Sequence, residues 1–152
     1  EWSMKRFLTL GFVILVALST SAQWSNPSRD VPAHNAEAPK KGTKQRPILP
    51  VLMRTGPSFQ LAYQKKAYAL AEKMPDVLHQ QPCYCFCDRS FGHNSLRSCF
   101  ETDHGAHCAA CMKEVFYTAK MLKQKKTPAQ IREGIIRGEW QNIDLEKAAF
   151  AN

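Results

Sequence analysis

Hydrophobic residues recur at helical spacing in three stretches of the chain, and this pattern sets the first expectation for the fold. In residues 57–74 an apolar residue returns every three or four positions, and a proline bounds the stretch at each end. Residues 108–126 repeat this spacing and end in a run rich in lysine, which suits the C-terminal end of a helix dipole. A third helix should begin at Thr127, because Thr127-Pro128-Ala129-Gln130 has the form of a capping box.

The stretch between the first two helices, residues 75–107, has no strong periodicity. Ordering a backbone costs about 1–2 kcal/mol per residue, and an irregular stretch of this length is rare inside a compact domain. We therefore expect a mainly α, small single domain at residues 57–142, with about three helices around a long Cys/His-rich irregular loop that is cross-linked through its sulfur atoms. Residues 143–152 are expected to form a loosely held tail.

The N-terminal residues 1–22 have the features of a signal peptide. A basic Met4-Lys5-Arg6 precedes an apolar run, and small residues precede a cleavage site between Ala22 and Gln23. The apolar run is shorter than the about 20 residues that a membrane-spanning helix needs. We expect an exported protein, in the periplasm or outside the cell, with no transmembrane helix in the mature chain. An uncleaved membrane anchor is the alternative.

Residues 23–56 form a proline-rich basic linker in this interpretation. They hold five of the chain's nine prolines, with six basic residues against two acidic ones, although the chain of 152 residues carries a net charge of only +8. Such a composition buries little surface, so a solvated spacer is expected, with attraction to an anionic lipid surface as the alternative. Nucleic acid is not an expected partner, because stacking aromatic residues do not alternate with the basic ones.

All six cysteines lie between residues 83 and 111, where several histidines accompany them. In an extended C-x-C-x-C segment, Cys83, Cys85 and Cys87 would point to one side. Cys108-Ala109-Ala110-Cys111 lies at a predicted helix start, where free amides and the dipole favour the thiolate, and its spacing is also that of many metal sites. These features predict sulfur chemistry without deciding between metal binding, redox exchange and disulfide formation.

Three motifs of this region resemble the bacterial PCYCGC-motif domain, also called the CYCXC family of (seleno)proteins. They are Pro82-Cys83-Tyr84-Cys85-Phe86-Cys87, then Gly92-His93-x-Ser95-Leu96-x-x-Cys99-Phe100, and His104-Gly105-x-x-Cys108-x-x-Cys111. The resemblance implies an exported protein whose function is not established. Selenium in some members implies redox work or soft-metal binding. Phe86 stands where the family usually has glycine, which argues against a tight backbone turn there.

Metal binding is the favoured hypothesis, with zinc, copper or an iron–sulfur cluster as the bound group, because thiolates prefer soft metals to hard cations. The first alternative is a thiol–disulfide redox protein with Cys108 as nucleophile, and the second is a domain stapled by structural disulfides. Whether the protein is an enzyme stays open. A periplasmic or membrane-associated redox or metal-handling protein is the expected protein partner. The candidate metal ligands are Cys83, Cys85, Cys87, His93, Cys99, His104, Cys108 and Cys111.

Overall fold

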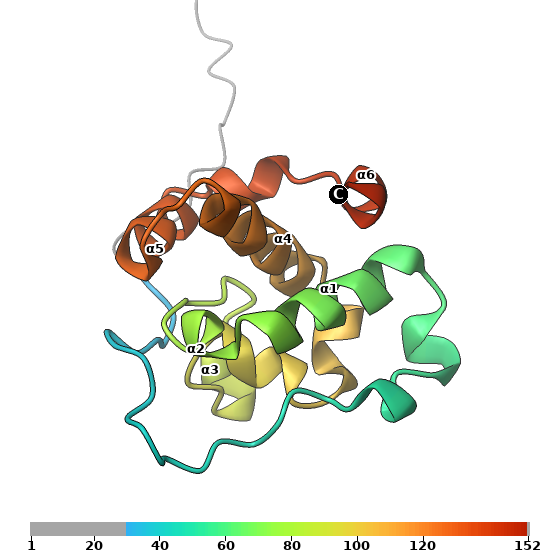
Figure 1. The fold of residues 1–152 in the computed structure, drawn as a ribbon, viewed down its shortest axis with the longest axis horizontal. Coiled ribbons are helices and arrows are strands. Elements are labelled where there is room, and N and C mark those ends of the chain that lie inside the picture. Colours follow the sequence, from blue (N-terminus) through green and yellow to red (C-terminus); the bar gives the residue numbers. More distant parts are fainter. Residues whose placement is uncertain (1–29, 152) are drawn as a thin grey trace, which may run out of the picture.

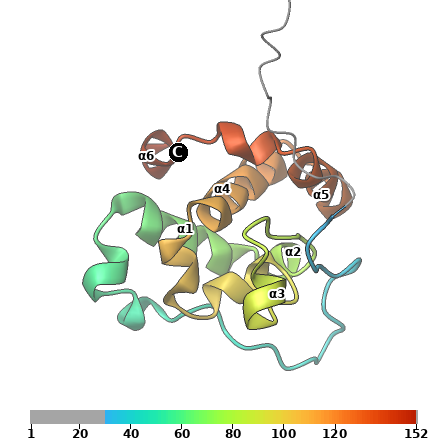
Figure 2. The same ribbon diagram turned by 180° about the vertical axis from the view of Figure 1, so that it is seen from behind.

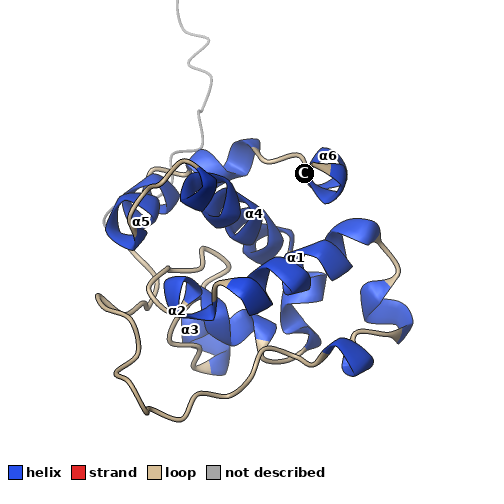
Figure 3. Cartoon of the chain, viewed as in Figure 1, coloured by secondary structure: helices blue, strands red, loops and turns tan. Residues whose placement is uncertain are grey.

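The computed structural model describes residues 30–151, and within them every regular element is a helix (Figure 3). The predicted mainly α fold is confirmed. The α-helices are α1 (Ala62–Lys73), α2 (Pro75–Leu78), α3 (Cys87–Phe91), α4 (Ala109–Lys123), α5 (Pro128–Ile136) and α6 (Leu145–Phe150). Short 3-10 helices occupy Val51–Met53, Gly56–Phe59, Leu96–Phe100, Asp103–His107 and Glu139–Asn142.

Helices α1 and α4 pack against each other at the centre of the molecule (Figure 1). They correspond to the two strongest periodic patterns of the sequence, and α1 ends before Pro75, as its proline boundary predicts. The start predicted at residue 57 is wrong, because Gly56–Phe59 forms a separate 3-10 helix and α1 begins at Ala62. The capping box is also present, because Thr127 Oγ1 accepts from the Gln130 amide and the Gln130 side chain accepts from the Thr127 amide. These three helices could be predicted because the signals that mark them lie within their own segments of the sequence.

Tyr68 connects α1 to the segment that follows Phe100. Its side chain is fully buried, edge-on to the rings of Phe59 and Phe100, with centroids 4.9 and 4.8 Å away. Its hydroxyl donates to the Thr102 carbonyl at 2.7 Å and accepts from the Ala106 amide at 3.2 Å. Helix α1 therefore fixes the backbone on both sides of His104.

Residues 75–107 are more regular than expected. They contain α2, α3 and two 3-10 helices, each of five residues or fewer. Elements this short complete fewer than two turns and show no periodicity that a sequence pattern could reveal. Gln81, which is fully buried, accepts from the Leu96 amide at 2.8 Å through its carbonyl and so joins two parts of this region.

The N-terminal part of the described chain packs on the domain, unlike the solvated spacer predicted for residues 23–56. It runs along the edge of the molecule in both views (Figures 1 and 2). Ile48 and Leu49 belong to the buried core, and Arg54 is buried with hydrogen bonds from Nε to the Leu49 carbonyl (2.7 Å) and from Nη2 to Glu72 (3.0 Å). A few well-placed residues therefore hold a segment whose average composition is that of a linker.

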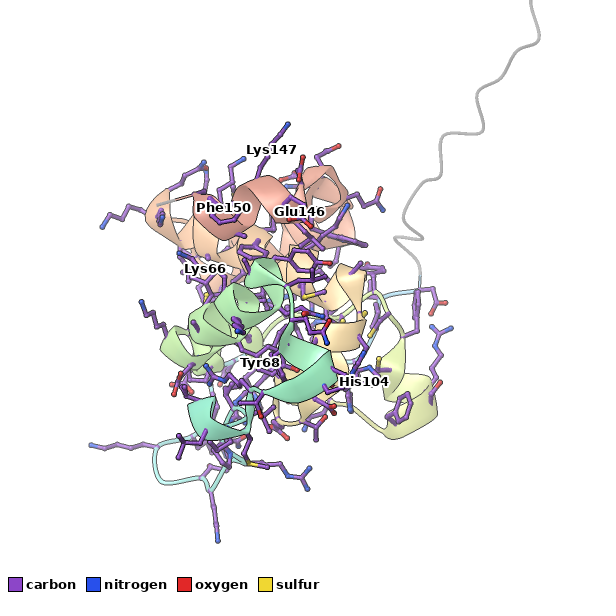
Figure 4. The ribbon with its side chains drawn as sticks, turned by 90° about the vertical axis from the view of Figure 1, so that its right-hand side faces the viewer. Lys66, Tyr68, His104, Glu146, Lys147 and Phe150 are labelled. Carbon is purple, nitrogen blue, oxygen red and sulfur yellow. The ribbon has the colours of Figure 1, made fainter. Side chains whose placement is uncertain are left out.

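The C-terminal residues also differ from a loose tail. Helix α6 packs against α1, with Leu145 and Ala148 against the core. Figure 4 shows Lys147 and Phe150 at this end of the molecule, away from His104. The Asp144 side chain accepts from the Lys147 amide at 3.1 Å and caps the helix. This N-cap is a local signal that the sequence contains.

The predicted signal peptide, residues 1–22, lies outside the described residues. Among residues 30–151, no helix combines the length and apolar character that crossing a bilayer demands.

Candidate metal centre

A tight turn, and not an extended strand, arranges the first three cysteines. The Phe86 amide donates to the Cys83 carbonyl at 3.1 Å, and Phe86 has a left-handed backbone with φ of 54° before Cys87 begins α3. The expectation that Phe86 argues against a tight turn is therefore wrong. This conformation costs a non-glycine residue about 1–2 kcal/mol. The Phe86 ring regains part of it by packing edge-on to Tyr84 and under the Arg89 guanidinium, 4.3 Å from the ring centroid.

The Cys-x-x-Cys motif lies at the start of α4, as predicted. Cys108 is the N-cap, and its Sγ accepts from the Cys111 amide at 3.4 Å. Cys111 is fully buried and its sulfur lies 3.3 Å from Cys83 Sγ. The first helical turn thus directs Cys111 into the interior, while Cys108 stays half-buried at the helix end.

Two 3-10 helices supply the other donors. Cys99 is fully buried in Leu96–Phe100, and half-buried His104 lies in Asp103–His107. Nε2 of His104 lies 3.0 Å from Cys87 Sγ, and sulfur atoms lie beside His104 in Figure 4. Gly105 permits the close approach of the two 3-10 helices, because a Cβ there would lie 2.9 Å from the Cys99 carbonyl oxygen.

Three sulfur atoms form a compact triangle at the centre of the site. Cys83 Sγ lies 3.1 Å from Cys85 Sγ and 3.3 Å from Cys111 Sγ, and Cys85 and Cys111 are 3.6 Å apart. A disulfide bond would need about 2.05 Å. All six cysteines belong to the described part of the chain, and all are free.

Two groups of side chains have the geometry to hold a metal ion. The first comprises Cys83, Cys85, Cys99 and Cys111, and the second comprises Cys85, Cys87, Cys99 and His104. Within each group the ligand atoms all lie within 4.8 Å of one another. Sulfur donors dominate both groups, and thiolates prefer soft ions to hard ones.

The thiols of the cluster shift one another's pKa values. Hydrogen bonds from Cys108 and Cys111 lower the pKa of the Cys85 thiol to about 3. Hydrogen bonds from Cys111 and Cys83 lower the pKa of the Cys99 thiol to about 2. Burial raises the pKa of Cys83, and the hydrogen bond with Cys108 is the largest cause that raises that of Cys111. The pKa values of Cys85 and Cys99 are thus shifted towards the thiolate, and those of Cys83 and Cys111 towards the neutral thiol.

A buried carboxyl group holds the turn at residues 83–86 in place through a hydrogen bond. Glu114 of α4 is fully buried, and its Oε1 accepts from the Tyr84 amide at 2.8 Å. Burial raises the pKa of Glu114 well above its usual value, so the neutral acid is favoured. Glu114 was missed by the sequence analysis, because a charged residue type on a helix is ordinarily assigned to the solvent face.

The solvent side of the centre is covered by aromatic rings and by the N-terminal segment. His93 Nδ1 lies 3.3 Å from Cys99 Sγ, and the His93 and His104 rings are 5.2 Å apart. Phe91 lies against both histidines but is itself 65% exposed. Pro32, which is fully buried, lines the same small crevice as Cys83, Cys87 and His93. The donors are thus buried on the core side and approachable near the histidines.

Comparison with known proteins agrees with the cysteine pattern. The model of a family described as "Protein of unknown function with PCYCGC motif" matches residues 8–141. The chain belongs to this family. No curated protein and no solved structure matches it. In this member of the PCYCGC family the motif reads Pro82-Cys83-Tyr84-Cys85-Phe86-Cys87, and its three cysteines all fall within the two groups described above.

The structure brings together most of the candidate ligands of this PCYCGC protein, but not all. Cys108 and His93 lie beside the two four-donor groups without belonging to either. Cys108 is occupied as the N-cap of α4, and His93 contacts the sulfur of Cys99. His107, outside the family pattern, is exposed and contacts Ser58 Oγ at 2.9 Å.

Proposed function

We propose that this protein is an exported metal-binding protein that holds a soft transition-metal ion, zinc or copper, in its buried thiolate cluster. The observation that carries the proposal is the convergence of five sulfurs and one imidazole nitrogen in two groups of four donors. These donors come from α3, α4, two 3-10 helices and the turn at residues 83–86. Their convergence is a property of the fold and not of one local motif.

The spacing of the sulfur atoms supports a metal ion at this place. A tetrahedral zinc ion with Zn–S bonds of about 2.3 Å requires S···S distances of about 3.8 Å. The triangle of Cys83, Cys85 and Cys111 has sides of 3.1 to 3.6 Å, so its sides would lengthen by about 0.2 to 0.7 Å to reach this spacing. A disulfide bond would link two of these sulfur atoms and leave the third unbonded beside them. A shared cation uses all three.

The proposal accounts for how an exported protein would retain a set of free thiols. Thiolates coordinated by a closed-shell ion are protected from the oxidants outside the cytoplasm, and the binding free energy becomes folding free energy. Because the donors tie the turn at Cys83 and Cys85 to α4 through Cys111, the ion would stabilise the packing between these elements.

The test is a titration of the purified, reduced and metal-free protein with Zn²⁺ and with Cu⁺ under exclusion of oxygen. We expect stoichiometric binding by mass spectrometry of the native protein. At a thousandfold excess of free ion over Kd, binding stabilises a protein by about 4 kcal/mol, which raises Tm by about 10 °C in a domain of this size. A protein that binds neither ion, or that is isolated with all six cysteines in disulfides, contradicts the proposal.

Cys108 offers a control that separates metal binding from redox exchange. In the redox alternative, Cys108 is the nucleophile, half-buried at the start of α4. The hydrogen bond with Cys111 lowers its pKa, but the hydrogen bond with Cys85 and burial outweigh it and raise the pKa of Cys108, so the expectation that the helix start favours its thiolate is wrong. Cys108→Ser would then abolish any thiol–disulfide exchange activity. Metal binding predicts that Cys108→Ser keeps the bound ion, because Cys108 belongs to neither four-donor group and serine is a good N-cap. Replacement of Cys85 and Cys99 together by serine is expected to abolish binding.

Export is tested separately. When the full chain is expressed in a bacterium with an intact secretion system, we expect a product outside the cytoplasm. Its intact mass should equal that of residues 23–152, which corresponds to cleavage before Gln23. Recovery from the cytoplasm with residues 1–22 attached contradicts this part of the proposal.

A further inference from the structure

The two four-donor groups overlap, and the overlap has a definite chemical meaning. Cys85 and Cys99 belong to both groups, whereas Cys83 and Cys111 occur only in the first, and Cys87 and His104 only in the second. If one ion took each group, two sulfur atoms would have to serve both ions. We propose that the protein binds two soft divalent ions, bridged by the thiolates of Cys85 and Cys99. This inference rests on the proposed function and specifies the number and arrangement of the ions.

The identity of the shared donors agrees with what bridging requires. A thiolate sulfur has several lone pairs and can bind two ions, whereas a neutral imidazole has one nitrogen lone pair for one ion. Both shared donors are cysteines, and the histidine of the set, His104, belongs to a single group. The structure thus places sulfur at the positions where two ions would share a ligand, and nitrogen at a terminal position.

The charge of the donor set also favours two ions. The groups contain five cysteines, and coordination deprotonates each of them. One divalent ion in the first group coordinates four thiolates and leaves two negative charges among largely buried side chains, whereas two divalent ions coordinate all five thiolates and leave one. Because uncompensated charge in a protein interior is costly, the second ion stabilises the complete set of thiolates.

The two positions differ in depth, so the two ions should exchange at different rates. The first group contains three buried cysteines, Cys83, Cys99 and Cys111. The second includes half-buried His104, whose ring contacts the exposed Phe91 with centroids 4.9 Å apart. We expect a chelator to remove the ion near His104 first and the ion bound by Cys111 later.

The experiment uses native mass spectrometry and X-ray absorption on the reduced full chain loaded with Zn²⁺. We expect two Zn²⁺ per chain and a zinc–zinc distance of about 2.7–3.2 Å: two regular tetrahedra with Zn–S bonds of about 2.3 Å that share an edge give about 2.7 Å, and repulsion between the two cations lengthens this distance. Loading with ¹¹³Cd²⁺ should give two coupled cadmium resonances, because a bridging sulfur transmits spin coupling.

Matched variants assign the two positions. His104→Ala and Cys87→Ser, each tested separately, should reduce the stoichiometry from two Zn²⁺ to one and abolish the short zinc–zinc distance. Cys108→Ser and His107→Ala replace nearby residues outside both groups and should retain two ions. If either ligand variant fails to fold, the other still tests the position near His104.

The possible results separate this inference from the proposed function. Two ions at a short distance, with one lost in His104→Ala or Cys87→Ser, support it. One Zn²⁺ in the unmodified protein overturns the dinuclear arrangement and leaves the proposed metal-binding function standing. Two ions without a short zinc–zinc distance overturn the thiolate bridge. No bound ion overturns both proposals.

Discussion

The hydroxyl of Tyr68 connects the helical core to the candidate metal centre, and this connection can be tested directly. It donates to the Thr102 carbonyl and accepts from the Ala106 amide, at 2.7 and 3.2 Å, on either side of His104. Burial raises the pKa of Tyr68 strongly, so the hydroxyl keeps its proton throughout the usable pH range. Tyr68→Phe removes this single group and keeps the ring that packs between Phe59 and Phe100.

The expected cost follows from the two partners that Tyr68→Phe leaves behind. The ring is fully buried, so water does not replace the hydroxyl. A buried polar group that loses its partner costs about 1–3 kcal/mol, and with two such groups we expect the free energy of unfolding to fall by about 2–4 kcal/mol. This is a large part of the 5–15 kcal/mol that is typical of a protein domain.

The measurement is urea unfolding of the metal-free and the Zn²⁺-loaded protein, followed by circular dichroism. Tyr63→Phe is the matched control, because Tyr63 lies on the same helix and its hydroxyl makes no hydrogen bond within residues 30–151. The control should change stability by less than about 0.5 kcal/mol. Equal effects of the two substitutions would refute the role assigned to Tyr68. We also expect Tyr68→Phe to weaken binding of the ion near His104.

Three further predictions concern the surroundings of the site and the acid stability of the fold. Gly105→Ala should lower stability by about 1–3 kcal/mol in urea unfolding, because the new Cβ would meet the Cys99 carbonyl at 2.9 Å; an unchanged midpoint would contradict this. Glu114→Leu should cost about 1–3 kcal/mol, since the Tyr84 amide loses its acceptor, whereas Glu114→Gln, which keeps a carbonyl oxygen, should cost less; equal losses would contradict the role of that hydrogen bond. The hydrogen bond from the Tyr117 hydroxyl lowers the pKa of Glu139. The Glu139 carboxylate therefore stabilises the fold above its unfolded pKa of about 4.3, and this stabilisation is lost as the pH falls through the folded pKa. In thermal unfolding at a series of pH values, the difference in stability between the unmodified protein and Glu139→Gln should narrow below about pH 4; a constant difference would contradict this.

The elements that could be predicted from the sequence are those whose signals are local. The periodicity of residues 57–74 and 108–126 and the capping box at Thr127 each concern side chains within a few turns of one another. The packing of residues 30–56 depends instead on distant partners. Arg54 can be buried because its guanidinium donates hydrogen bonds to Glu72 and to the Leu49 carbonyl. The composition of the segment does not indicate these partners.

Glycine positions show the same limit. Gly134 reads as a residue that weakens α5, and helix propensity justifies that interpretation. In the structure, a Cβ at Gly134 would lie 1.9 Å from the hydroxyl oxygen of Tyr117, which comes from α4. The lower helix propensity of glycine at this position is offset because the Tyr117 hydroxyl fills the space beside Gly134 and donates a hydrogen bond to Glu139. The sequence pattern shows the unfavourable helix propensity at position 134 but not the contact with Tyr117 that offsets it.

For the site, the sequence predicts which residue types can act, and the fold decides how they combine. An extended C-x-C-x-C would place three equivalent sulfurs on one side. The left-handed turn at Phe86 instead makes them different, with Cys83 in the first donor group, Cys87 in the second, and Cys85 in both. Cys99 is equally central, although it stands alone in the sequence, because its 3-10 helix is held against Gly105. In the proposed dinuclear site the bridging role falls to Cys85 and Cys99, because they are the two donors that both groups contain. The left-handed turn at Phe86 thus distributes the three cysteines of the motif over the two donor groups.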